Sequence, residues 1–193
     1  MTDKELYSAT AIALTFIAFI PYIRSILHNK IKPHVFSWII WGSTTFIVFL
    51  AQLEGGGGYG AWPIGVSGII TLYVAFLAYA KKADTTITIT DWCFFIAAMA
   101  SIPIWYFTSN PLGAVILLTV IDLLGFGPTI RKAYNHPFEE NVTFFLIFLT
   151  RNIIAIMALE HYSMTTTLFP AAIAGASLAL VILILFRRRK LSL

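Results

Sequence analysis

Long apolar stretches recur along the whole chain and are separated by short polar segments. Each stretch holds about 20 residues, and an α-helix of that length spans the roughly 30 Å hydrocarbon core of a bilayer. The pattern predicts seven such helices, at residues 5–27, 33–53, 62–80, 91–107, 112–134, 141–160 and 168–186. We therefore expect an all-α integral membrane protein with seven transmembrane helices and almost no soluble part.

The composition agrees with this expectation. Of the 193 residues, 59% are hydrophobic and only 11% are charged, which leaves too few charges for the surface of a soluble domain. The first stretch is expected to be a membrane helix and not a signal peptide, because only Lys4 precedes it and no small-x-small cleavage site is evident. The one cysteine, Cys93, lies inside an apolar stretch, so no disulfide, metal site or cofactor is expected.

The basic residues predict how the helices are oriented. Of the 13 Lys and Arg residues, 11 lie in the last turn of the first, third, fifth or seventh helix or after it. They are Arg24, Lys30, Lys32, Lys81, Lys82, Arg131, Lys132, Arg187, Arg188, Arg189 and Lys190. Because cytosolic segments are enriched in Lys and Arg, we expect the N-terminus outside and the C-terminus in the cytosol, in a plasma or bacterial inner membrane. The basic tail is expected to contact anionic lipids, and nucleic acid is not expected as a partner.

The two halves of the chain match each other at an offset of 107 residues. Matched positions include Pro21 and Pro128, Arg24 and Arg131, Pro63 and Pro170, and Gly68 and Gly175. Two proline pairs, an arginine pair and a glycine pair in one register indicate a duplicated three-helix unit. We expect parallel repeats at residues 1–82 and 111–193. Helix four, at 83–110, is then the linker that lets the second repeat insert in the same direction.

A proline motif occurs once in each repeat. Residues 21–30 hold a proline followed by a basic loop, residues 37–42 add a serine and two tryptophans, and residues 127–131 repeat the proline. This pattern resembles the signature of proline-glutamine-loop transporters and SWEET sugar carriers, over essentially the whole chain. Where that signature has its glutamine, this chain has Tyr22 in one half and Thr129 in the other. The resemblance implies a three-plus-one-plus-three fold and a transport function.

Proline and glycine suggest where the backbone bends. Pro21 and Pro128 each lack a backbone donor and clash with the preceding turn, so both helices are expected to kink near their cytosolic ends. Matched kinks would provide two hinges for a cytosolic gate; the alternative is that each proline merely ends the regular helix. The glycine-rich segment at 54–60 is expected to be a flexible hinge on the outside.

Polar residues within the apolar helices are the candidates for solute binding. They are Thr15, Ser37, Trp41, Thr44, Thr45, Asp122, Arg151 and Asn152. Four of them share one face of helix two, because their spacing follows the helical turn. The repeat offset relates Thr15 to Asp122. It also relates Thr44 to Arg151, so the second half has charges where the first has hydroxyls. Trp41 either packs against its neighbours or forms a stacking platform for a ligand.

Asp122 and Arg151 are the two most informative of these residues. Counted along their helices at about 1.5 Å per residue, they lie about 14 and about 16 Å from the cytosolic ends, near the bilayer midplane. A lone charge at that depth costs about 3 kcal/mol, so the two side chains are expected to face inwards and to pair directly or through water. They form either a static ion pair or part of a polar site that binds a solute or exchanges a proton.

The function expected from these features is transport. A carrier would move a small polar solute, a sugar or similar, by alternating access at the midplane, and one chain contains both repeats. One alternative is a receptor of the same superfamily that binds a peptide or small ligand without transport. Another is a proton-coupled carrier of amino acids or vitamin precursors. An enzyme is not expected, because no nucleophile-base pair, paired carboxylates or metal ligands converge.

Overall fold

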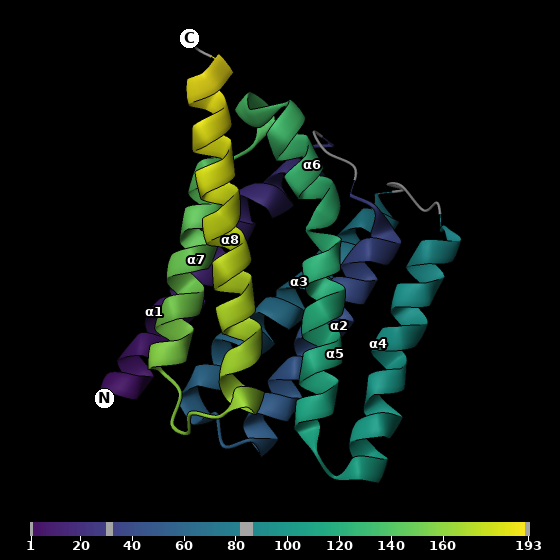
Figure 1. Cartoon of the computed structure of the whole chain (residues 1–193), viewed down its shortest axis with the longest axis vertical. Helices are drawn as coiled ribbons and strands as arrows, with labels where there is room; N and C mark the ends of the chain where they lie inside the picture. Colours follow the sequence, from purple (N-terminus) through teal and green to yellow (C-terminus); the bar gives the residue numbers. More distant parts are fainter. Residues whose placement is uncertain (1, 30–32, 82–86, 192–193) are drawn as a thin grey trace.

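The computed structural model describes residues 2–29, 33–81 and 87–191, and the regular elements within these ranges are helices (Figure 1). The α-helices are α1 (Asp3–Leu27), α2 (Val35–Glu54), α3 (Trp62–Ala80), α4 (Ile89–Thr108), α5 (Pro111–Gly125), α6 (Gly127–Asn135), α7 (Val142–Met157) and α8 (Met164–Leu191). Two short 3₁₀-helices are η1 (Gly58–Ala61) and η2 (Pro137–Glu139). The prediction of an all-α protein is confirmed. Each predicted helix has a counterpart, except that the predicted helix at 112–134 is divided into α5 and α6.

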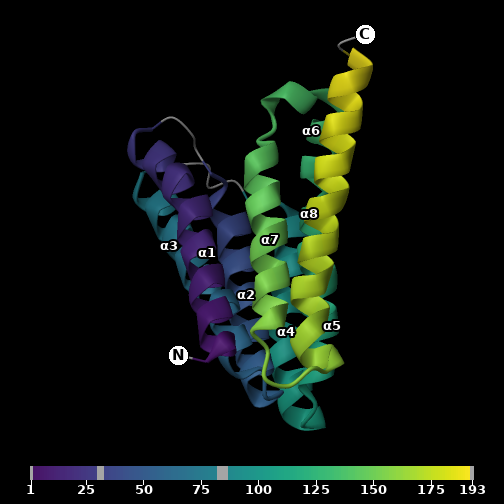
Figure 2. The same cartoon turned by 90° about the vertical axis from the view of Figure 1, so that its left-hand side faces the viewer.

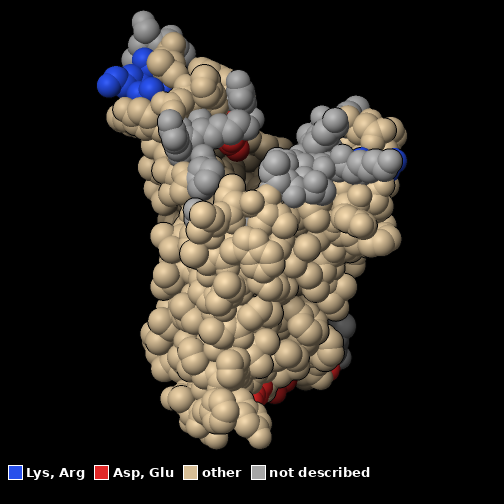
Figure 3. Space-filling view, turned by 90° about the vertical axis from the view of Figure 1, so that its right-hand side faces the viewer, with Lys and Arg blue, Asp and Glu red and all other residues tan. Residues whose placement is uncertain are grey.

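Four helices are long and apolar enough to cross a membrane, by length and composition: α1, α2, α3 together with η1, and α8. Three further apolar helices are shorter, at Trp92–Thr108, Pro111–Gly125 and Val142–Met157. Figure 3 shows Lys, Arg, Asp and Glu gathered towards the two ends of the molecule, with an uncharged flank between them. Long apolar helices and an uncharged flank are what a membrane protein requires, because hydrocarbon cannot solvate charge.

Polar caps define where the apolar helices begin. At the start of α1, the Glu5 N–H donates to Thr2 Oγ1, and the Thr2 N–H donates to the Glu5 carboxylate, which is a capping box. The side-chain oxygens of Asn110 and Asn141 accept from the first turns of α5 and α7. These caps satisfy backbone donors that a helix end leaves free, so each helix starts at a defined residue.

The helices pack in two groups. In one group, α3 packs against both α1 and α2; in the other, α8 packs against both α5 and α7. The groups meet where α1 lies beside α7 and where α2 lies beside α5 (Figures 1 and 2). α4 packs against α5 and α2. The predicted boundary between the first repeat and the linker helix, at residues 82 and 83, lies outside the described residues.

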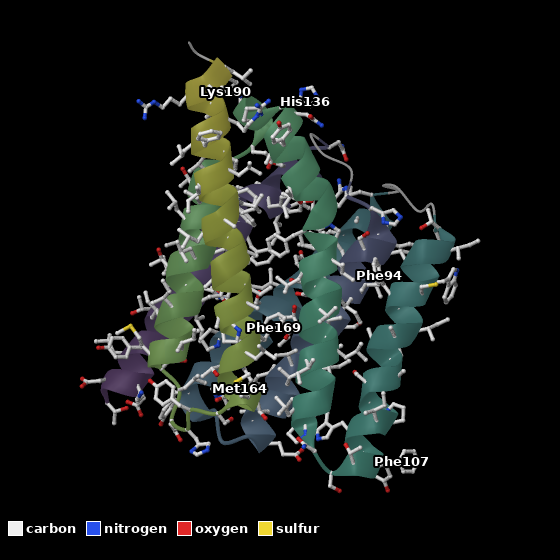
Figure 4. All side chains as sticks on the ribbon, viewed as in Figure 1. Phe94, Phe107, His136, Met164, Phe169 and Lys190 are labelled. Carbon is white, nitrogen blue, oxygen red and sulfur yellow. The ribbon has the colours of Figure 1, made fainter. Side chains whose placement is uncertain are left out.

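The largest apolar core lies between the two groups. Its fully buried members include Val48 on α2, Ile64 on α3, and Val115 and Leu118 on α5. Phe169 of α8 also belongs to this core, and side chains fill the space between the ribbons of α5 and α8 (Figure 4). The core therefore holds the two groups together through apolar contact, and the few polar side chains within it need a separate explanation.

Glycine allows α2 and α3 to approach each other closely. A Cβ atom added at Gly42 would lie 2.7 Å from the Leu72 side chain and 2.9 Å from the Leu72 backbone nitrogen. At Gly65, the nearest contact would be the Phe49 ring, at 2.8 Å. These two glycines act as small residues at a membrane helix interface, where they permit tight packing.

We expect Gly42→Ala to destabilise the protein by about 1–3 kcal/mol, because the added methyl group forces α2 and α3 apart. Gly175→Ala on α8 is the matched control, since a Cβ at Gly175 would meet nothing within 4 Å. Alanine favours a helix over glycine, so the control should be neutral or more stable by up to about 1 kcal/mol. Unfolding of both variants in detergent measures the difference, and equal midpoints would contradict this account of the interface.

The two proline positions differ in structure. α1 is one helix that continues through Pro21 to Leu27. In the second half, α5 ends at Gly125, Phe126 interrupts the helix, and α6 contains Pro128 in its first turn. Proline is tolerated in a first turn because its missing N–H would be unbonded there in any case. The side chain of Pro128 lies outside the described part of the chain, and the role of both prolines as hinges stays a prediction.

Candidate functional site

Asp122 lies on α5, where α5 contacts α2. Only 8% of its surface is exposed. The Thr44 hydroxyl of α2 donates to Asp122 Oδ1 at 2.7 Å. The same hydroxyl lies 2.9 Å from the carbonyl oxygen of Trp41, so two acceptors compete for one proton. We call the Asp122–Thr44 contact the acidic bridge; it joins α5 to α2 and hence one group of helices to the other.

Arg151 lies on α7, where α7 contacts α1, and is 3% exposed. Its Nε donates to the Thr15 hydroxyl of α1 at 3.1 Å, and Nη2 donates to the carbonyl oxygen of Pro63 in α3 at 2.6 Å. Nη1 donates to Asn152 Oδ1 at 2.9 Å. All three acceptors are uncharged. We call the Arg151–Thr15 contact the basic bridge; like the acidic bridge, it joins the two groups of helices.

Asp122 and Arg151 form no direct ion pair: in the part of the chain that is described, each bonds only to neutral groups. We expected the two side chains to pair directly or through water; the direct bond is not formed, and pairing through water stays a prediction. Both side chains do face inwards and are buried, as expected. The pair fails because α5 packs against α2 and α8, whereas α7 packs against α1 and α8, so the two charges meet different helices. Residue counting predicts their depth in the bilayer but not their neighbours.

The two bridges occupy equivalent positions of the predicted repeats. The offset of 107 residues that relates Thr15 to Asp122 also relates Thr44 to Arg151. Each bridge therefore joins the helix-one position of one half to the helix-two position of the other half. One bridge contains an acidic side chain and the other a basic side chain. The same kind of contact, an ionisable side chain on a threonine hydroxyl, therefore occurs twice.

Aromatic side chains lie next to both bridges. Trp41, one turn before Thr44, packs edge-on against Trp38 with ring centroids 5.7 Å apart. A Cβ at Gly125 of α5 would lie 2.6 Å from Trp41 Nε1, so Trp41 lies against α5. Its repeat equivalent, Phe148, contacts Phe19 of α1 at 5.8 Å. The described contacts of Trp41 are packing contacts, and its possible role as a stacking platform stays a prediction.

The remaining predicted site residues are divided between two locations. Asn152 is fully buried and belongs to the basic bridge, where its Nδ2 also donates to the carbonyl oxygen of Phe148 at 2.8 Å. Thr45 is buried next to Thr44 on α2. Ser37 lies instead in the first turn of α2, with Oγ 2.7 Å from His34 Nδ1. Seven residues separate Ser37 from Thr44, which corresponds to about 10 Å along the helix, so Ser37 lies away from the bridges.

One member of the basic bridge was missed by sequence reasoning. The carbonyl oxygen of Pro63 accepts the shortest hydrogen bond of Arg151, whereas the sequence named Pro63 only as the repeat partner of Pro170. A backbone carbonyl has no residue-type signal, so the sequence could not identify it. The only available hint was the matched proline pair of the repeat offset.

A second set of contacts joins the two groups at the N-terminal end of the bundle, where η1 meets the connection between α7 and α8. The Glu160 N–H donates to the Gly57 carbonyl oxygen at 3.2 Å, and a Cβ at Gly60 would lie 2.6 Å from the Leu159 backbone nitrogen. Gly56 and Gly58 have positive φ angles of 78° and 53°, which favour glycine. We call residues 55–61 together with 158–161 the glycine seam. The expectation of a flexible hinge was wrong, because this segment is closely packed.

Hydrogen bonds from two side chains reinforce the glycine seam. Gln52 Nε2 donates to the carbonyl oxygen of Thr166 at 2.7 Å, and Gln52 is fully buried. Lys4 Nζ donates to the carbonyl oxygen of Met157 at 2.7 Å. Both bonds run from one group of helices to the other. The two groups are therefore joined by hydrogen bonds at this end as well as at the bridges.

The basic tail partly folds back onto the protein. Arg187 donates to the carbonyl oxygen of Tyr134 at 2.9 Å and lies over its ring at 4.0 Å. Arg188 donates to the carbonyl oxygens of Pro137 and Glu140 at 3.0 and 2.7 Å. These two cations fix α8 to α6 and to the connection between α6 and α7. Arg189 and Lys190 are exposed, and contact of the basic tail with anionic lipids stays a prediction.

The described side chains include no group of three or more His, Cys, Asp or Glu residues that could hold a metal ion. Cys93 is exposed and has a free thiol. No family model, curated protein or solved structure matches the chain.

Proposed function

We propose that this protein is a membrane carrier that moves a small polar solute by alternating access between two repeats. On this proposal the chain has seven spans, an external N-terminus and a cytosolic C-terminus, as in the SWEET-like carriers that the sequence resembles. The observation that carries the proposal is the pair of bridges, which bury opposite charges at equivalent positions between the two groups of helices.

The helix contacts support the repeat arrangement. The packing of α3 on α1 and α2 corresponds to the packing of α8 on α5 and α7, and the α1–α7 contact corresponds to the α5–α2 contact. The chain termini lie at opposite ends of the molecule (Figure 2), which agrees with an odd number of spans. The short α5 is followed by α6, and the two together approach the length of a membrane helix.

Buried charges between the two groups support transport over a purely structural role. A charge near the bilayer midplane is costly, and apolar side chains of similar shape stabilise a static contact at least as well. In carriers with internal repeats, the solute site lies near the midplane between the repeats. Residue counting predicts that depth for Asp122 and Arg151, and both bridges lie between the two groups of helices. The charges are therefore most simply explained as part of a site for a solute.

The test is uptake by the purified full-length chain in proteoliposomes. Labelled sugars, amino acids and nucleosides are supplied one at a time, with protein-free liposomes and Gly175→Ala as controls. A carrier should accumulate one class of solute and exchange it in counterflow, and Gly175→Ala should match the wild type. Binding of a solute without uptake or counterflow would favour a receptor, and the proposed function would then be wrong.

A further inference from the structure

We propose that the solute is a small zwitterion, whose cationic group binds Asp122 and whose anionic group binds Arg151; this inference rests on the proposed function. Both charges lack a counter-charge among the described residues. Asp122 accepts one hydrogen bond, from the neutral Thr44 hydroxyl. A buried charge without a counter-charge is costly, so a ligand that supplies the opposite charge gains binding energy.

Arg151 has donors left for a ligand. Its guanidinium group carries five N–H bonds, and the three described hydrogen bonds, to Thr15, Pro63 and Asn152, use three of them. Two N–H groups and the full positive charge are then available to a carboxylate. Carboxylates accept two parallel hydrogen bonds from a guanidinium group, which is the strongest arrangement for such a pair.

The acidic bridge is also short of one donor. The Thr44 hydroxyl has one proton and two acceptors, Asp122 Oδ1 at 2.7 Å and the Trp41 carbonyl oxygen at 2.9 Å. The Trp41 carbonyl oxygen lies inside α2, where the helical backbone also supplies it with a donor, so the shared Thr44 hydroxyl matters most to Asp122. It is the one described donor to the carboxylate. An ammonium group at Asp122 would give the carboxylate donors of its own and the opposite charge.

The arrangement of the bridges selects a solute with both charges. They lie at equivalent positions of the two predicted halves and join the same two groups of helices, so we expect a solute that binds between the groups to reach both bridges. A sugar would leave both buried charges without a partner. An amine or a carboxylate alone would satisfy one charge and leave the other. A zwitterion satisfies both and leaves the complex without net charge, which favours its passage through a low-dielectric interior.

The experiment measures ligand-induced stabilisation of the purified full-length chain in detergent. The probes are glycine, β-alanine and 4-aminobutyrate, which separate the two charges by increasing lengths; butylamine, butyrate and glucose are the matched controls. We expect at least one zwitterion to raise the unfolding temperature at concentrations where the controls have no effect. In Asp122→Asn, the affinity for that zwitterion should fall at least tenfold, while butyrate binding is unchanged or improved.

The outcomes distinguish this inference from the proposed function. Uptake of glucose without zwitterion binding overturns the inference and leaves the carrier. Zwitterion binding without uptake supports the inference and overturns the carrier. If neither class binds nor is taken up, both are wrong. Asp122→Asn preserves an acceptor for Thr44 and should fold; if it does not, Arg151→Lys replaces it, and its loss of zwitterion affinity should exceed its loss of butylamine affinity.

Discussion

Replacing Asp122 by asparagine should reduce solute uptake by about 10- to 100-fold and leave the unfolding temperature near that of the wild type. The asparagine side chain has the same shape and still accepts a hydrogen bond from Thr44, so the contact between α5 and α2 is kept. It loses only the negative charge. A hydrogen bond to a charged group contributes about 1.5–3 kcal/mol, which corresponds to the expected range of rates. Initial rates in proteoliposomes, with the amount of folded protein equalised, measure the effect.

Thr119→Val is the matched control for this prediction. Thr119 is buried on the same helix, one turn before Asp122, but its hydroxyl donates within α5, to the Val115 carbonyl oxygen at 2.6 Å. The valine variant should keep nearly normal uptake, because it changes no contact between the groups of helices. Equal uptake by Asp122→Asn and the wild type would mean that the acidic bridge is structural only. A drop in both variants would point to a general sensitivity of α5.

The helices were predictable from sequence because each follows from a local pattern. Apolar runs of sufficient length set their positions, and residues such as Asn110 and Asn141 set their starts. The division at Phe126 was not predictable, since a proline in the second position of a new helix and a proline inside a continuing helix have the same local sequence signal. Pro21 and Pro128 were expected to behave alike, and the structure treats them differently.

Parts of the candidate site were predictable, but its pairing was not. The predicted repeat offset relates Thr15 to Asp122 and Thr44 to Arg151, and these four side chains meet in two contacts between the groups of helices. The direct bond between Asp122 and Arg151, one of the two ways in which they were expected to pair, is not formed. Counting residues predicts the depth of a side chain, whereas its partner depends on the order in which helices pack. The two contacts join each of these side chains to a hydroxyl of the other group of helices.

The glycine-rich segment shows a different limit of sequence reasoning. Its composition suggested a flexible chain, because glycine permits many conformations. Glycine also permits the closest approach of another backbone, and composition cannot distinguish the two uses. Leu159 lies about 100 residues further along the chain, so nothing local signals that it will contact Gly60. The glycine seam therefore depends on a close backbone contact, and a substitution that adds a side chain there should destabilise it.

Gly60→Ala should weaken the glycine seam by about 1–3 kcal/mol, the usual effect of overpacking a close contact. The added Cβ would lie 2.6 Å from the backbone nitrogen of Leu159 and 2.7 Å from its Cα, and backbone atoms cannot rotate away as a side chain can. The Glu160 N–H, which bonds to Gly57 across the seam, should therefore exchange its hydrogen faster. Hydrogen–deuterium exchange over residues 158–161 in lipid nanodiscs measures this directly.

Gly113→Ala is the control, because a Cβ on this helical glycine of α5 would meet nothing within 4 Å. Its exchange over residues 158–161 should match the wild type, and so should its uptake. In Gly60→Ala, a shift of 1–3 kcal/mol corresponds to about a 5- to 150-fold change in the ratio of molecules with an open glycine seam to molecules with a closed one. A carrier must separate and rejoin this end in every cycle, so uptake should change together with exchange. If Gly60→Ala shows faster exchange but unaltered uptake, the seam does not open during transport. If its exchange is unaltered, the close contact with Leu159 does not hold the two groups of helices together.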